Sequence, residues 1–109
     1  SYIPDRGDIV WIQMNPQAGR EQAGHRPAFI VSPKAYNGKV GLALMCPITS
    51  KEKGYPFEVR VDGKYTKGVV LSDQIKSLDW RAREARFEER AKDETIAEVS
   101  AKIEALIKV

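Results

Sequence analysis

The sequence predicts a mainly β domain that ends in one amphipathic α-helix. Short apolar runs separated by turn-forming residues are typical of strands, and the sequence has five of them, at residues 8–14, 28–31, 40–45, 57–61 and 69–71. From Thr95 onward the apolar spacing changes from two residues to three or four, which is typical of a helix. Because 109 residues fit a single domain, we expect a small, partly open β-barrel over residues 1–109, with the helix covering one face.

The composition is that of an ordinary folded domain, and it excludes several classes of protein and site. With 42% hydrophobic and 30% charged residues, general disorder is not expected. The single cysteine, Cys46, cannot form an internal disulfide, and the single histidine, His25, cannot pair with another to make a common zinc site. No run is long and apolar enough for a signal peptide or a membrane span. We therefore expect a cytoplasmic protein.

The net charge of +3 is concentrated in the middle of the chain. Residues 34–76 contain eight basic and four acidic side chains, whereas the signs cancel in residues 1–33 and 81–109. This predicts a moderately basic central surface, which is suited to phosphates or to an acidic peptide.

The first three strands are expected to form a meander. Residues 8–14 are apolar on both faces at their start, as in a strand covered on both sides. The polar loop at residues 15–26 follows, then the second strand at residues 28–31. The Asn-Gly pair at residues 37–38 is a strong turn signal, and it predicts a tight turn before the third strand at residues 40–45.

The later strands are predicted from side-chain alternation. In residues 57–61 apolar and charged residues alternate, so Phe57, Val59 and Val61 are expected to face the core. Residues 78–87 give a mixed signal, which we interpret as extended chain.

The C-terminal helix has one apolar face, for which core packing is the expected role. Five residues form this face: Ile96, Val99, Ile103, Leu106 and Ile107. Thr95 and Glu98 match a capping box, and Asp93 is a competing N-cap.

Three polar clusters could carry chemistry. The first places Glu21, His25 and Arg26 within six residues, a combination that can transfer protons and bind phosphate. A structural role explains the same cluster equally well, with Arg26 in an ion pair with a nearby carboxylate and His25 packed against its neighbours. Cys46 ends an apolar stretch, which favours burial over a role as a nucleophile.

The second cluster combines hydroxyl groups, basic groups and a ring. Thr49 and Ser50 can donate to a phosphate, Lys53 can neutralise it, and Tyr55 can stack on a base. The alternative is a solvated loop with Tyr55 filling the barrel.

The third cluster follows directly after a strand and contains Asp73, Gln74 and Lys76. Gln74 can read a base edge, although a turn at the end of the strand explains these residues as well.

Two specific blocks carry a family resemblance, Glu-Gln-Ala-Gly-His-Arg-Pro at residues 21–27 and Lys-Gly-Tyr-Pro-Phe-Glu at residues 53–58. Further matches lie at residues 4–11 and 73–77, so the resemblance covers nearly the whole chain in order. The sequence resembles the MazF toxins. These are ribosome-independent mRNA endoribonucleases (mRNA interferases) of bacterial toxin–antitoxin modules, a group that includes the PemK and Kid toxins.

The resemblance implies an SH3-like, partly open barrel of the CcdB/PemK type, a homodimer, and metal-independent cleavage of single-stranded RNA at a short sequence. Arg26 and Thr49 occupy the positions of the family's catalytic pair, and Glu21 matches a residue important for activity. Some PemK-type relatives have an arginine where this chain has Leu71, so a mechanism that pairs such an arginine with Asp73 is not expected.

RNA can be cut without a metal because its own 2′-OH attacks the adjacent phosphate, leaving a 2′,3′-cyclic phosphate and a 5′-OH. A guanidinium keeps its proton at physiological pH, so proton abstraction is left open between Arg26, Glu21 and His25. Two mobile loops, residues 15–24 and 50–55, are expected to clamp the strand. The residues expected to bind substrate are Gln22, His25, Ser50, Lys53, Tyr55, Asp73, Gln74 and Lys76.

A MazE-like antitoxin is the expected partner, laying an acidic, largely disordered tail over the basic surface. Two other functions are compatible with such a barrel. One is RNA binding without cleavage, and the other is poisoning of gyrase, as by toxins of the CcdB type.

Overall fold

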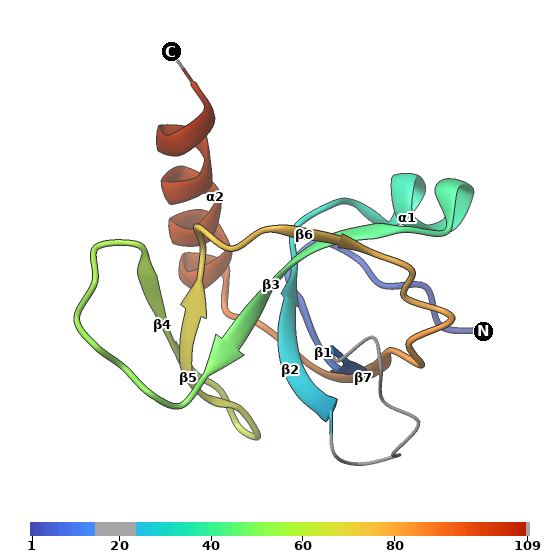
Figure 1. Ribbon diagram of the computed structural model, residues 1–109, viewed down its shortest axis with the longest axis horizontal. Helices are drawn as coiled ribbons and strands as arrows, with labels where there is room; N and C mark the ends of the chain where they lie inside the picture. Colours follow the sequence, from blue (N-terminus) through green and yellow to red (C-terminus); the bar gives the residue numbers. More distant parts are fainter. Residues whose placement is uncertain (15–23, 109) are drawn as a thin grey trace.

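The computed structural model describes residues 1–14 and 24–108, which are mainly β with a long helix at the C-terminal end (Figure 1). This confirms the predicted fold class. The elements of the described residues are β1 (Asp8–Gln13), β2 (His25–Ile30), α1 (Lys34–Val40), β3 (Ala43–Thr49), β4 (Glu58–Asp62), β5 (Lys67–Leu71), β6 (Lys76–Leu78), β7 (Arg86–Arg90) and α2 (Asp93–Ile107).

The strands form one curved antiparallel sheet in the order β4-β5-β3-β2-β1-β7, with β6 added beside β3. The predicted meander of the first three strands is confirmed, because β2 pairs with both β1 and β3. Strand β3 changes partner along its length. It pairs with β2 from Met45 to Pro47 and with β5 at Ile48 and Thr49, so the sheet bends into a half-barrel there.

Both faces of the sheet are covered, as the apolar start of the first strand predicted. Ile9 packs in a cluster with Phe29 and with Val99 of α2. Val10, the next residue along β1, packs in a second cluster with Trp80 on the opposite face. Each fully buried side chain of this size contributes roughly 1.5–3 kcal/mol to stability. The two clusters therefore hold β1, β2 and β3 together from both faces of the sheet.

The turn predicted at residues 37–38 is wrong, because these residues lie inside helix α1. The Asn37 side chain is buried and donates to the carbonyl oxygens of Pro4 and Ser32, at 2.8 and 2.9 Å. A Cβ on Gly38 would lie 3.2 Å from a methyl group of Ile3. Contacts with the distant N-terminal segment therefore decide this conformation over the local preference for a turn.

The predicted capping of the C-terminal helix is also wrong. Helix α2 begins at Asp93 after the N-cap Lys92, which makes no side-chain cap, and Thr95 is buried within the first turn. The carboxylates of Asp93 and Glu94 favour this end of the helix dipole instead.

Only part of the predicted apolar face packs against the sheet. Val99 and Ile103 are buried, whereas Leu106 and Ile107 in the last turn are 46% and 71% exposed. Residues 79–85 interrupt the predicted extended segment with turns, because Trp80 folds inward and donates its indole N–H to the backbone of Asn37 at 3.0 Å. No helix among the described residues has the length and apolar character needed to cross a bilayer.

One carboxylate links the two ends of the sheet. Glu89 of β7 accepts hydrogen bonds from the backbone N–H groups of Lys64, Tyr65 and Thr66, in the turn between β4 and β5. Partial burial by itself raises the pKa of Glu89, but these donors outweigh it and hold the pKa below its usual range. The charged form of Glu89 therefore closes the half-barrel.

Candidate active site

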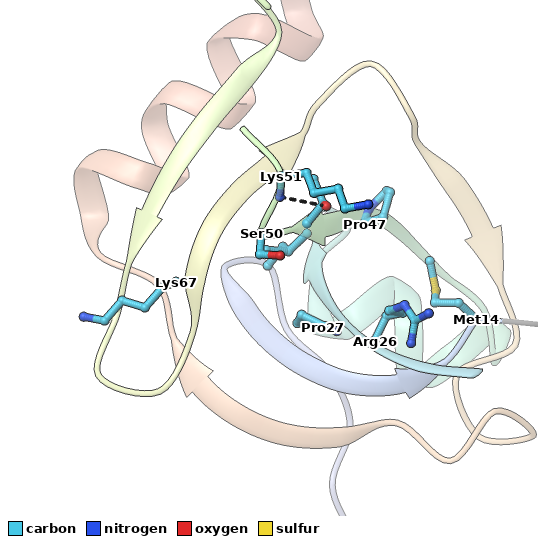
Figure 2. Close-up of a pocket in the computed structure, with 9 residues that line it drawn as sticks. Met14, Arg26, Pro27, Pro47, Ser50, Lys51 and Lys67 are labelled. Carbon is cyan, nitrogen blue, oxygen red and sulfur yellow. Dashed lines mark hydrogen bonds between the residues drawn. The ribbon is translucent and has the colours of Figure 1, made fainter. Parts of the chain in front are cut away.

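A hollow of about 540 Å³ opens where β3 leaves β2 to pair with β5 (Figure 2). Its size is within the range of ligand-binding sites. Four segments meet around it, namely the end of β1, the start of β2, the end of β3 and the start of β5. The lining residues are Met14, Arg26, Pro27, Pro47, Ile48, Thr49, Ser50, Lys51 and Lys67.

Arg26 is an exposed residue near the start of β2, and it lines this hollow beside Pro27. Its Nη1 donates to the carbonyl oxygen of His25 at 2.8 Å, which anchors the guanidinium to its own strand. Within residues 1–14 and 24–108 no carboxylate lies within ion-pair distance of Arg26. Because a guanidinium has five N–H donors, Arg26 keeps donors for an anion in the hollow.

Thr49 ends β3 in the same hollow, so the structure brings it together with Arg26. The Thr49 Oγ1 accepts a hydrogen bond from the backbone N–H of Lys51 at 3.2 Å, drawn as the dashed line in Figure 2. Because a hydroxyl group has one donor and two acceptor lone pairs, its proton is left to donate to a ligand. Ser50, the next residue, is exposed and also lines the hollow.

A second hollow of about 260 Å³ adjoins the first, since both are lined by Thr49 and Lys51. It contains four of the residues predicted to bind substrate: Lys53, Tyr55, Asp73 and Gln74. Tyr55 is 60% exposed, so it does not fill the barrel. Leu71 also lines this hollow, where it contributes no charge. The two hollows form one track with basic and hydroxyl groups at one end and an aromatic ring and an amide at the other.

Two of the predicted residues in the described part of the chain lie away from the track. The His25 ring is buried and stacks on Trp11, with centroids 6.1 Å apart and planes inclined by 23°. Its Nδ1 has no hydrogen-bond partner among the described residues. Lys76 is exposed on β6 and lines neither hollow. Glu21 and Gln22 lie outside the described residues.

Sequence reasoning missed several residues that line the first hollow. Met14 and Pro47 form part of its wall, and Lys51 and Lys67 add two cations. Lys67 donates to Asp62 at 2.9 Å and thereby lowers the pKa of that carboxyl group, but both side chains are about two-thirds exposed, so water screens this pair. The excess of positive charge in residues 34–76 was the one signal that pointed toward Lys51 and Lys67.

Cys46 is buried in the core, as predicted. Burial, reinforced by the charge of Asp73, raises the pKa of its thiol to about 12. The thiol is therefore protonated at neutral pH and is not a nucleophile of the site.

Comparison with known proteins assigns the family. The model of a family described as "PemK-like, MazF-like toxin of type II toxin-antitoxin system" matches residues 5–107. The chain belongs to the PemK/MazF toxin family. The endoribonuclease toxin MazF of Escherichia coli K12 is 48% identical over 106 residues, which are 97% of this chain and 96% of that protein.

Solved structures of PemK/MazF toxins have the same fold. The crystal structure of MazF from Deinococcus radiodurans matches with a TM-score of 0.89 at 48% identity and covers 100% of both chains. A chain of the MazE–MazF complex from the same organism matches with a TM-score of 0.87 at 44% identity, covering 98% of this chain and 97% of that one.

Each of the two most specific motifs of the PemK/MazF resemblance contributes described residues to one of the hollows. The block at residues 21–27 supplies Arg26 and Pro27 to the first, and the block at residues 53–58 supplies Lys53 and Tyr55 to the second.

Proposed function

We propose that this protein is an endoribonuclease toxin of a type II toxin–antitoxin system that cuts single-stranded mRNA at a short sequence. Cleavage needs neither a metal ion nor the ribosome, and it stops translation and growth. The observation that carries the proposal is the meeting of Arg26 and Thr49 in one hollow of a chain that is 48% identical to MazF of Escherichia coli.

In the proposed reaction the RNA supplies its own nucleophile. The 2′-oxygen forms a bond to phosphorus, the bond from phosphorus to the 5′-oxygen breaks, and the products are a 2′,3′-cyclic phosphate and a 5′-OH. Arg26 stabilises the charge on the phosphorane, and the hydroxyl group of Thr49 donates a hydrogen bond to a non-bridging oxygen. The free donors of both side chains support these roles.

Two protons move in this reaction. The proton of the 2′-OH passes to a base, which we assign to Glu21, because Arg26 stays protonated while it binds the phosphorane and His25 does not line the hollow. A water molecule from the solvent donates a second proton to the leaving 5′-oxygen, and the resulting hydroxide takes up the proton held by the base, so the protein ends the reaction unchanged.

We propose that the second hollow takes an unpaired base next to the scissile phosphate. Tyr55 offers a stacking surface, and Gln74 offers an amide donor and an acceptor that can pair with a base edge. Lys51 and Lys53 hold the RNA backbone between the two hollows, with Ser50 as a further donor.

We infer that the partner is a MazE-like antitoxin that lays an acidic segment over this track, since the four cations Arg26, Lys51, Lys53 and Lys67 line it. The MazE–MazF structures from Deinococcus radiodurans support this pairing. We also propose that the toxin is a homodimer and acts in the cytoplasm, where mRNA is translated.

Cleavage of an end-labelled single-stranded RNA in EDTA tests the proposed function. We expect cleavage with cyclic-phosphate ends, and Arg26→Lys should lower kcat/KM by about 100-fold or more, because lysine cannot make the bidentate contact. Arg81→Lys is the matched control, since Arg81 lines neither hollow and contacts Trp80 instead.

Retardation of the RNA without cleavage would support a non-catalytic binding protein and overturn the proposed function. Inhibition of gyrase that Arg26→Lys leaves intact, in a protein that does not cut RNA, would support the alternative of a gyrase poison.

A further inference from the structure

The loop between β3 and β4, residues 50–57, carries Lys53 and Tyr55 and is held by the carboxylate of Glu58. The backbone N–H of Lys53 donates to both Glu58 oxygens, at 3.1 and 3.2 Å, and that of Gly54 donates to one of them at 2.9 Å. The Glu58 N–H in turn donates to the carbonyl oxygen of Tyr55 at 3.1 Å. Two residues of this loop, Lys53 and Gly54, are thus tied to the first residue of β4.

Gly54 makes this geometry possible. Its φ of +82° lies in the left-handed region that side chains rarely adopt. With this backbone conformation the N–H groups of residues 53 and 54 point toward the same carboxylate. The Lys-Gly-Tyr-Pro-Phe-Glu block therefore contains both the turn and the acceptor that fixes it.

A second contact comes from the C-terminal helix. The ammonium group of Lys102 on α2 donates to the carbonyl oxygen of Pro56 and lies 3.4 Å from that of Glu58. It is also 3.7 Å from a carboxylate oxygen of Glu98. The Lys102 side chain is only 29% exposed, against 73% for Lys108 on the same helix. Lys102 thus directs its charge at the loop backbone, whereas Lys108 makes an ordinary surface ion pair.

We propose that Glu58 and Lys102 are positioning residues that preorganise Lys53 and Tyr55 to bind RNA. This inference rests on the proposed function. Glu58 lines the second hollow, but its carboxylate oxygens accept from the loop, and Lys102 lines neither hollow. Both act on RNA through the loop that they hold, and a loop ordered before binding costs the complex less entropy.

We call the two side chains Glu58 and Lys102 the loop brace. Losing one of them should weaken RNA binding and should not slow the cleavage step. Arg26 and Thr49 are anchored by contacts of their own, to the His25 carbonyl and the Lys51 N–H. Removing the Lys102 donor should therefore raise KM while kcat stays within about twofold, which is the pattern of lost ground-state binding.

The test compares three substitutions on one helix. Lys102→Met keeps the length of the side chain but removes the donor, Lys102→Arg restores a donor, and Lys108→Met removes an exposed lysine as the matched control. KM and kcat are measured for a short RNA. Affinity is measured with the same oligonucleotide carrying a 2′-deoxy sugar at the cleaved position, and thermal unfolding shows that each variant is folded.

We expect Lys102→Met to raise KM, and Kd for the uncleavable RNA, about five- to tenfold, with most of the effect recovered in Lys102→Arg and none seen in Lys108→Met. Amide hydrogen exchange at Lys53 and Gly54 should become at least about tenfold faster in Lys102→Met. Glu58→Gln, which removes one acceptor oxygen, should change KM and exchange in the same direction.

If Lys102→Met and Glu58→Gln both keep the KM, Kd and exchange rates of the wild type, the proposed role of Glu58 and Lys102 is overturned, even if the wild-type protein cleaves RNA. A fall in kcat with KM unchanged would also overturn it. Conversely, a wild-type protein that binds but does not cleave RNA would refute the proposed function, while the affinity and exchange measurements would still decide the brace.

Discussion

Gly68 lies on β5 so close to the end of β3 that any Cβ there would displace the Thr49 backbone. Gly68→Ala therefore tests whether the position of Thr49 controls catalysis. A Cβ at residue 68 would lie 2.3 Å from the carbonyl oxygen of Thr49 and 3.3 Å from the Cα of Ser50. Ordinary contacts begin near 3.4 Å, so the Thr49 carbonyl must move by about 1 Å, and a displacement of that size at a reacting group costs about 100-fold in rate. We therefore expect kcat/KM for RNA cleavage to fall by about two orders of magnitude.

The backbone conformation of Gly68 gives a second effect, on the free energy of unfolding. The φ of +149° at Gly68 is strained for an L-residue, at a cost of about 1–3 kcal/mol. A loss of 1 kcal/mol lowers Tm by about 4–8 °C in a domain of this size. The variant should therefore remain folded at 25 °C, and its activity is measured there.

Gly41→Ala is the control for this strain. Gly41 has a φ of +83° at the C-cap of α1, and no atom lies within 4 Å of a Cβ built there. It should lose a similar amount of stability, about 1 kcal/mol, and keep full kcat/KM. If Gly68→Ala retains wild-type kcat/KM, or if Gly41→Ala loses as much activity as Gly68→Ala, the reasoning from the position of Thr49 is refuted.

Three further predictions concern charge and burial. Glu89→Gln should lower the free energy of unfolding in urea by about 1–2 kcal/mol at pH 7. Because the folded-state pKa of Glu89 is lowered, this stabilisation is present above the unfolded value near 4.5 and is lost as the pH falls through the folded pKa. A difference in unfolding free energy between the wild type and Glu89→Gln that is as large at pH 3 as at pH 7 would contradict this prediction. Lys51→Gln should reduce the slope of log Kd against log salt for single-stranded RNA by about 0.7, with Lys108→Gln unchanged. Cys46, with its thiol pKa raised to about 12, should resist iodoacetamide in the native protein and react on denaturation, whereas rapid labelling of the native protein would show that the core is open.

The helix α1 and the start of α2 show where local patterns fail in this chain. Asn37 and Gly38 carry a strong turn signal, but contacts with Pro4 and Ile3, more than thirty residues away, outweigh it. The capping pattern of Thr95 and Glu98 places the N-cap at Thr95, but the N-cap is Lys92, three residues earlier, and Thr95 is buried in the first turn. The conformation of α1 cannot be worked out from neighbouring residues, because its deciding contacts are tertiary, whereas the start of α2 agrees with the local charges of Asp93 and Glu94.

Some residues of the candidate site could be predicted from the sequence, and the placement of others required the structure. Arg26, Thr49, Lys53, Tyr55 and Gln74 could be singled out beforehand because polar and aromatic residues interrupt apolar runs there, in blocks that resemble a known family. The sequence did not predict that His25 is buried against Trp11 or that Lys76 is exposed away from the track. Polarity alone does not say which way the side chain of a strand residue faces.

By itself the sequence determined a mainly β domain with a C-terminal helix, the family, and most of the residue types at the site. These follow from periodicity and from motifs, which are properties of neighbouring residues. Only the tertiary structure decided that β3 leaves β2 at Pro47, so that Arg26 and Thr49 share one hollow, and that Lys102 reaches the backbone of a loop 46 residues earlier in the chain. The physical reason is that hydrogen bonds and packing between distant segments set both arrangements, and no local pattern encodes them.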